Sequence, residues 1–222
     1  MSTPGADPAA PGGGLLADVV HARLLDRIVD GTLPPGSALS VPALAAGLGV
    51  SRSPVRESVQ RLIHDGLAVH VPHAGARVAH VDDEEILDVL RVRELLDGLA
   101  AHEATLRADA SDLAALRAVL DREEAALTAP AEPHRDAGLD LEFHGLLRDV
   151  AANAALRDVL RRLEVKGHVH RSGMWSLPRH RELALAEHHR VLAAVEAGDA
   201  DGARAAAAAH VAALAVRLRR LA

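Results

Sequence analysis

The sequence predicts a mainly α protein, in which an N-terminal winged helix-turn-helix precedes a C-terminal all-α antiparallel helical bundle. Two short helical patterns joined by a tight turn are followed, before residue 80, by an alternating apolar stretch typical of a small β-hairpin. Beyond residue 82 the apolar residues keep a helical period. Aromatic residues make up only 1% of the 222 residues, so the core of both parts must be aliphatic.

Composition excludes several classes of protein. The chain has no cysteine, which rules out disulfides, thiolate metal sites and a cysteine nucleophile. No apolar run approaches the roughly 18 residues of a membrane span. Residues 1–14, "MSTPGADPAAPGGG", lack the basic and apolar regions of a signal peptide and predict a disordered tail. We therefore expect a cytoplasmic protein with no membrane partner.

The first domain is expected over residues 15–80. Its first helix spans about 15–29, and the turn "LPPGSAL" follows. Ser40 is placed to cap a short helix, Ser51 to cap the next one, and Gly66 to end it. A hairpin over about 67–78 turns at "PHAG". The apolar residues that repeat every four positions in the first helix are Leu16, Val20, Leu24 and Ile28.

The second domain is expected over residues 81–222 as a bundle of about six helices. Asp83, Ser111 and Asp199 are candidate N-caps. The loops "TAPAEP", "SGMWSLP" and "AGD" separate several of the helices. The expected helices are 83–106, 111–127, 135–150, 153–171, 179–197 and 199–221.

The helix that opens at Ser51 carries the first candidate site. In a winged helix-turn-helix this helix enters the major groove, and its N-terminal residues meet base edges. Arg52 and Arg56 lie four residues apart on one stripe, and an arginine fork matches guanine O6 and N7. Arginines and acidic residues are equal in number over residues 1–80, so the prediction rests on position rather than on charge. The candidate DNA-binding residues are Ser51, Arg52, Ser53, Arg56, Gly75 and Arg77.

The whole run "GTLPPGSALSVPALAAGLGVSRSPVRESVQRLIHDGLAVHVPHAGARV" is more specific than its two arginines. It closely resembles the DNA-binding head of GntR-family bacterial transcription regulators. The resemblance implies that Arg52 and Arg56 contact bases and phosphates and that Gly75 lies at the wing tip. The family often has a charged residue near the start of the helix before the turn, where this chain has "SVPAL".

Four residues of the second half form a candidate metal site. Asp140 and His144 are four apart, on one face of a helix. His188 and His210 flank the turn at Gly198, each about 15 Å from it in an antiparallel helix pair. Three imidazoles and a carboxylate can bind zinc, nickel or manganese. The alternative from spacing alone is a set of unrelated histidines.

The remaining histidines are expected to have ordinary roles. His168 and His170 are reserve candidates for the metal site, and His188 is preferred over His189. Eight others fit solvated or half-buried positions: His21, His64, His70, His73, His80, His102, His134 and His180.

The segments "RVRELLDGLAAHEA", "LDLEFHGLLRDVAANAAL" and "EHHRVLAAVEAGDADGARAAAAAHV" are similar to the effector-binding domain of the FadR-type branch of GntR regulators. That resemblance implies a metal held by an Asp and three His at the positions named above, with small carboxylic acids as effectors. Arg91 or Arg93 could bind such a carboxylate, although ion pairs on a helix surface are the commoner use of such residues.

The predicted function is a ligand-responsive transcription regulator, with repression as the expected sign. A homodimer is expected to bind a palindromic double-stranded DNA operator, because one head reads a half-site. Two alternatives remain: a metal-dependent hydrolase with an accessory head, and a helical interaction protein with no operator. The hydrolase lacks a placed general base, a G-x-S-x-G elbow and an H-E-x-x-H motif.

Overall fold

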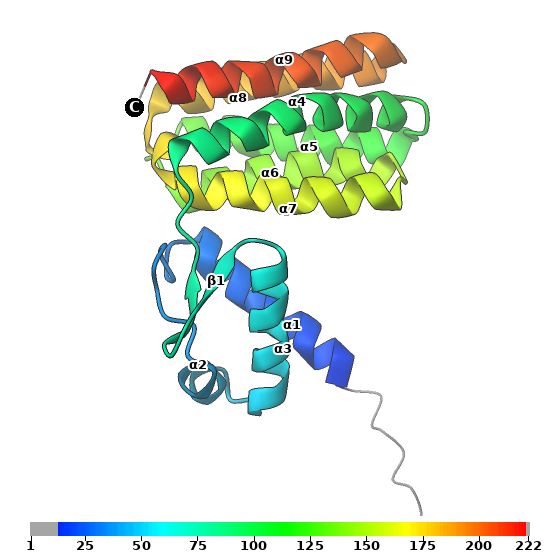
Figure 1. The fold of residues 1–222 in the computed structure, drawn as a ribbon. Helices are drawn as coiled ribbons and strands as arrows, with labels where there is room; N and C mark the ends of the chain where they lie inside the picture. The colour runs from blue at the N-terminus through cyan, green and yellow to red at the C-terminus, as the bar shows by residue number, and fades with distance from the viewer. Residues whose placement is uncertain (1–12, 221–222) are drawn as a thin grey trace, which may run out of the picture. The chain divides into compact units, whose positions relative to one another are not determined.

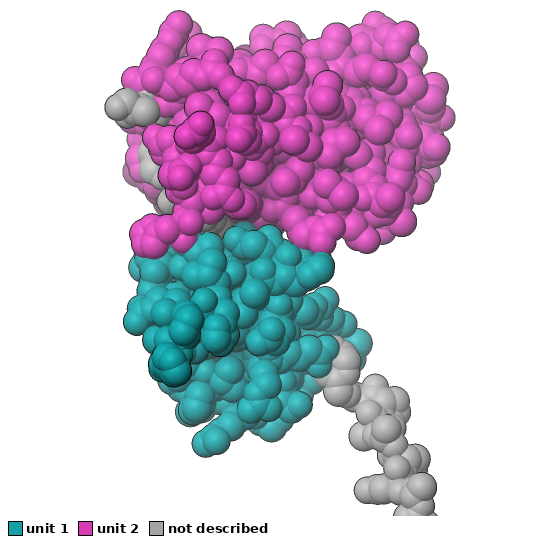
Figure 2. All heavy atoms as spheres, viewed as in Figure 1, with its two compact units in different colours: residues 1–28, 32–79 teal, residues 29–31, 80–222 magenta. Residues whose placement is uncertain are grey.

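The computed structural model describes residues 13–220, except for the side chains of residues 13–14 and 168–173. The chain forms two compact units, one of residues 1–28 and 32–79 and one of residues 29–31 and 80–222 (Figure 2). Residues 1–12 of the predicted disordered tail lie outside the described residues. The last two residues of that tail, Gly13 and Gly14, begin the first helix. The side chains of the reserve candidates His168 and His170 also lie outside the described residues.

The first unit contains the predicted helix-turn-helix and wing (Figure 1). Its core is aliphatic, and Val55, Val59 and Leu62 hold the third helix against it. Of the four apolar residues that repeat every four positions in the first helix, Leu16 is 40% exposed, because the buried stripe of that helix passes through Ala17 instead. The elements are α1 (Gly13–Val29), α2 (Val41–Leu48), α3 (Arg52–His64), β1 (Ala68–Val71) and β2 (Gly75–Val78).

The turn between α2 and α3 depends on a glycine. Gly49 has φ +67°, in the left-handed region, and its N–H bonds back to the carbonyls of Ala45 and Ala46. Ser40 and Ser51 stand at the N-cap positions of α2 and α3, but neither side chain makes a capping hydrogen bond. The prediction that these two side chains cap their helices by hydrogen bonds is therefore wrong. The Ser51 hydroxyl does not satisfy a backbone N–H of its own helix.

The second unit is the predicted helical bundle, whose axes run nearly parallel or antiparallel (Figure 1). α4 packs against α6, α7, α8 and α9, so it is central to the unit. Its elements are α4 (Asp83–Thr105), α5 (Ala110–Leu127), α6 (Pro133–Val150), α7 (Ala154–Arg171), the short 3-10 helix η1 (Ser172–Ser176), α8 (Pro178–Glu196) and α9 (Ala200–Arg219).

Two of the three predicted caps are shifted along the chain. Asp82, not Asp83, caps α4, and Asp109, not Ser111, caps α5 through a reciprocal box with Asp112. Asp199 caps α9 as predicted, by accepting from the N–H of Gly202. Each shift places the carboxylate where it satisfies backbone N–H groups of the first turn.

The bundle has a large aliphatic cluster around Phe143, the single phenylalanine of the chain. A second cluster joins the start of α4 to the end of α9 and includes Ile86, Leu90, Met174 and Leu218. The candidate metal residues lie next to Phe143, whose ring stacks on His188 at 4.3 Å between centroids. No helix among the described residues is both long and apolar enough to cross a bilayer.

Candidate functional site

The exposed stripe of α3 presents the residues predicted to contact DNA. Arg52 and Arg56 are exposed, while Val55 and Val59, on the neighbouring stripe of the helix, are buried. Ser51 and Ser53 are exposed at the helix N-terminus, where free N–H groups and the helix dipole favour anions. This stripe can therefore meet both base edges and phosphate oxygens.

The wing presents a tight tip. Gly75 pairs with Val71 and has φ +81°, which suits glycine, and His73 in the connection also has a positive φ. Arg77 is exposed, but its guanidinium donates to the carbonyl oxygen of Gly36 at 2.9 Å. The sequence did not reveal this contact, which ties the wing to the turn before α2.

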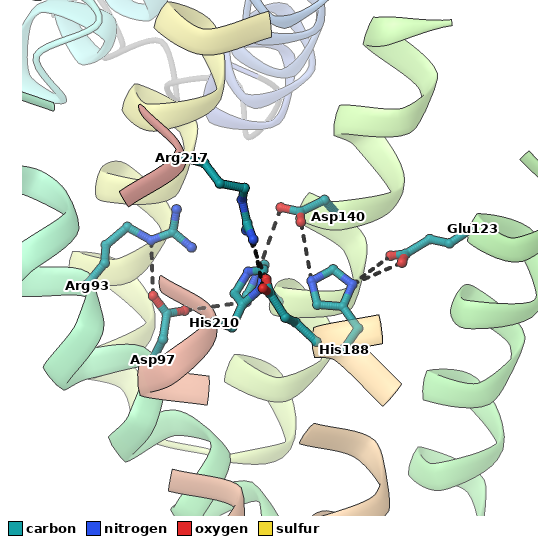
Figure 3. Close-up of polar contacts among 9 residues, drawn as sticks. Arg93, Asp97, Glu123, Asp140, His188, His210 and Arg217 are labelled. Carbon is teal, nitrogen blue, oxygen red and sulfur yellow. Dashed lines mark hydrogen bonds and ion pairs between the residues drawn. The ribbon is translucent and has the colours of Figure 1, made fainter. Parts of the chain in front are cut away.

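Three helices bring together the four residues predicted to bind a metal (Figure 3). One ligand atom from each of Asp140, His144, His188 and His210 lies within 4.8 Å of the others. The Nε2 atoms of His188 and His144 lie 3.3 and 3.8 Å from the Asp140 carboxylate. All four side chains are buried. Two bonds of about 2.1 Å to one ion span at most about 4.2 Å, so a small contraction brings all four to a single ion.

A second layer of carboxylates lies behind the three imidazoles. Asp97 of α4 lies 3.5 Å from Nδ1 of His144. Glu123 of α5 accepts from Nδ1 of His188 at 2.9 Å (Figure 3). Glu187 of α8 accepts from Nδ1 of His210, also at 2.9 Å. A carboxylate on Nδ1 fixes the proton there and directs the Nε2 lone pair toward the centre.

Two of these carboxylates are in turn held by arginines. Arg93 donates through Nε to Asp97 at 3.0 Å (Figure 3). Arg217 donates two hydrogen bonds to the carboxylate of Glu187. Sequence reasoning missed the whole layer. Only Glu187, next to His188, carried a local signal, since Asp97 and Glu123 lie far away in the chain.

The three imidazole rings of the candidate metal site differ in the direction in which their pKa values are shifted. Burial lowers the pKa of His144 well below its usual value and also lowers the pKa of His210, so both rings are neutral. Burial acts against a charged His188 as well, but the carboxylates of Glu123 and Asp140 outweigh it and raise its pKa to about 10. The acidic surroundings therefore favour one positive charge at the centre of the cluster.

A small cavity of about 30 Å³ adjoins this cluster inside the bundle. Arg93 lines it and is buried, whereas Arg91 is exposed and paired with Asp88. The structure thus brings one of the two predicted effector residues to the cavity. The lining among described residues is Ile86, Leu90, Arg93, Asp140, Gly167, Met174, Trp175, His180, Ala184, His210, Leu214 and Leu218.

The expectation of solvated or half-buried positions was wrong for two histidines. His21 and His180 are each only 5% exposed. His180 lies on α8 eight residues before His188, so both rings face the bundle interior, and no local pattern distinguished this ring from its neighbours. Burial and the Arg217 charge lower the pKa of His180 to about 4, which keeps the ring neutral.

Comparison with known proteins identifies both units. The FCD domain matches residues 88–213, more than half of the chain, and the gntR family of bacterial regulatory proteins matches residues 16–78. The chain belongs to the GntR family. An HTH-type transcriptional regulator of Streptomyces ambofaciens, in an unstable DNA locus, is 31% identical and the match covers 86% of this chain and 80% of that protein. The Bacillus subtilis regulator YdhC is 28% identical over 86% and 85% of the two chains.

Solved GntR structures have the same fold. McbR/YncC of Escherichia coli superposes with a TM-score of 0.82 at 24% identity, covering 93% of this chain and 98% of that one. The predictions of a winged helix-turn-helix, a helical bundle and a DNA-binding transcription regulator are therefore confirmed. Regulators of this family are named for transcription control rather than for catalysis, and no finding favours the hydrolase alternative.

Proposed function

We propose that this GntR regulator binds an inverted-repeat operator as a homodimer, and that a divalent metal ion and a small carboxylate effector in the bundle control the binding. A ligand can change DNA binding only if it favours one of two states of the protein. The observation that carries the proposal is the convergence of three Nε2 atoms and a carboxylate beside a buried cavity.

The residues present fit a metal ion. Because Asp97 and Glu187 face Nδ1 of His144 and His210, these two neutral rings direct their Nε2 lone pairs at each other across 3.3 Å, which is unfavourable unless a cation lies between them. Nε2 of His188 is buried and faces the Asp140 carboxylate 3.3 Å away, so this nitrogen also points into the centre of the cluster. Four carboxylates and two arginines surround or back the rings, and the two excess negative charges match a divalent ion.

Asp140, His144, His188 and His210 would hold this ion, and zinc, nickel and manganese all suit such ligands. When bound, the ion supplies a positive centre that can take an oxygen anion. Arg93 is a second cation on the same cavity, while the rest of the wall is mainly apolar. A small carboxylate with a short apolar body matches that lining.

For DNA binding, we assign base or phosphate contacts to Arg52 and Arg56, phosphate contacts to Ser51 and Ser53, and wing contacts to Gly75 and Arg77. The exposure of these residues and the N-terminal position of the first four on α3 support this assignment. We propose that this regulator represses transcription. A partly matching relative from Paenarthrobacter nicotinovorans carries the name of a D-xylose utilization operon transcriptional repressor.

The homodimer is proposed to form through the outer face of α4 and α7. Leu95 of α4 is 74% exposed, and Val92 and Val159 are exposed beside the apolar cluster that joins the two helices. Adjacent exposed apolar side chains mark interaction surfaces. A second copy is the occupant that the inverted-repeat operator requires, since each head reads one half-site.

The test is a gel-shift titration of the DNA upstream of the protein's own gene. Protein purified without an affinity tag is compared as isolated, after chelation, and after metal is restored, each with and without small acids. We expect sequence-specific binding that changes with metal or acid. Specific binding that responds to neither would contradict the control proposed for the bundle, and absence of specific binding would contradict the operator.

A further inference from the structure

His180 is a buried histidine with one ring nitrogen, Nδ1, that neither the fold nor the proposed metal site uses. Its Nδ1 is shielded from solvent and has no hydrogen-bond partner among the residues that the structure describes. Buried ring nitrogens are normally paired, and leaving one unpaired is unfavourable. His180 also lines the cavity beside the metal cluster, so this unpaired nitrogen is a candidate contact for a ligand that enters and widens that cavity.

His180 lines the same cavity as several charged or metal-binding side chains. The same small cavity is lined by Arg93, by the carboxylate of Asp140, by His210 and by His180. Met174, Leu214 and Leu218 fill much of the remaining wall. The two cationic positions, Arg93 and the proposed metal, suit a carboxylate. A neutral imidazole suits a different group, because it offers one N–H donor or one lone pair to an uncharged oxygen.

The ring is also fixed in place. Trp175 packs its ring edge-to-face with His180, with centroids 4.8 Å apart and an interplanar angle of 74°. Its lowered pKa keeps the imidazole neutral at physiological pH. A buried, oriented and uncharged hydrogen-bonding group discriminates between ligands that can pair with it and analogues that cannot.

We propose that His180 is a specificity-determining residue of the effector cavity, which hydrogen-bonds through Nδ1 to a hydroxyl or keto oxygen that the effector carries beside its carboxylate. This inference rests on the proposed carboxylate effector. The preferred ligands are the smallest hydroxy or keto acids, because the cavity of about 30 Å³ must widen even for these. The corresponding acid without the second oxygen leaves Nδ1 unpaired and binds about tenfold or more weakly.

Calorimetric titration of the full-length, metal-loaded protein with matched pairs of acids tests this assignment. The probes are glycolate against acetate and lactate against propionate. The variants are His180→Leu, which removes the hydrogen bond, and His180→Asn, whose amide can restore it. His189→Leu is the matched control, because His189 is exposed on the same helix. Emission of Trp175 offers an independent readout, as the chain has one tryptophan and no tyrosine.

We expect the wild type and His189→Leu to prefer the hydroxy acid of a pair by about tenfold or more. In His180→Leu that preference falls to near one while binding of the deoxy acid is retained, and His180→Asn recovers part of it. Equal affinity within every pair, or a preference that survives in His180→Leu, overturns the role of His180 and leaves the carboxylate effector standing. If no acid of either kind binds any variant, the effector proposal fails and the inference fails with it.

Discussion

The Nε2 atoms of His144 and His210 lie 3.3 Å apart in the interior of the bundle. Asp97 and Glu187 approach the opposite nitrogens of these two rings, so each ring keeps its proton on the outer side. Both rings also have lowered pKa values and are neutral. Two lone pairs therefore face each other across a short distance, which is the arrangement that a shared cation stabilises.

The outer carboxylates should tune the metal site without touching the ion. Replacing Glu123 with Gln removes the negative charge that holds the proton on Nδ1 of His188, while the side chain keeps its size. Loss of such a partner weakens metal affinity about 10- to 100-fold. Competition against a chromophoric chelator measures the effect. Glu124→Gln is the matched control, since Glu124 is the exposed neighbour on the same helix and should behave as wild type. Equal affinities in the two variants would contradict the role of Glu123.

Metal removal should destabilise the bundle. The proposed ion joins α6, α8 and α9, and any ligand that binds only the folded state raises its stability by mass action. We expect the melting temperature to fall on chelation in the wild type and to be insensitive to chelation in His188→Ala. Elemental analysis of untagged protein should find a transition metal in the wild type alone. A wild type that contains no metal, takes none up and melts identically with chelator would leave these histidines as core residues.

Operator binding should depend on the front of α3. Arg52→Ala and Arg56→Ala should each weaken it, by about 1–3 kcal/mol where the arginine reads a guanine, with the loss concentrated at one base position in each half-site. Helical content and the oligomeric state should not change, because both side chains are exposed. Arg61→Ala is the control from the far end of the same helix, where Arg61 pairs with Asp18. Equal losses in all three variants would argue against a recognition surface at the helix N-terminus.

How far the sequence predicted the structure differs between local and distant features. The helices of the bundle and the turn at Gly49 follow from periodicity and backbone preferences, which act over a few residues. Asp140 and His144 could be paired because they share one helix face. Glu123 and Asp97 could not be assigned to the site, since their approach to His188 and His144 depends on how α4 and α5 pack. The burial of His180 depends likewise on Trp175, which lies in η1.

Metal uptake should release protons. In the metal-free protein His188 has its pKa raised to about 10, so near pH 8 this ring holds a proton that the ion must displace. His144 and His210 are neutral there and contribute no proton. Metal affinity should therefore rise with pH between about 6.5 and 10, by up to tenfold per unit for one displaced proton. Titration calorimetry at pH 8, in buffers of different ionisation enthalpy, should give about one proton released per ion. A count of zero would contradict a charged His188.

Dimerisation should depend on the outer face of α4. Leu95→Asp places a charge at the centre of the proposed interface, and burying an unpaired carboxylate there is strongly unfavourable. The side chain is exposed and is not a member of any core cluster among the described residues, so the fold of one subunit should survive. Leu106→Asp is the matched control, because Leu106 is a similarly exposed leucine just beyond the end of the same helix, at 65% exposure.

Sedimentation at micromolar concentration should show a dimer for the wild type and for Leu106→Asp but a monomer for Leu95→Asp. The monomer should also lose its preference for an inverted repeat over a single half-site. A dimer that persists in Leu95→Asp would place the interface on another face of the bundle.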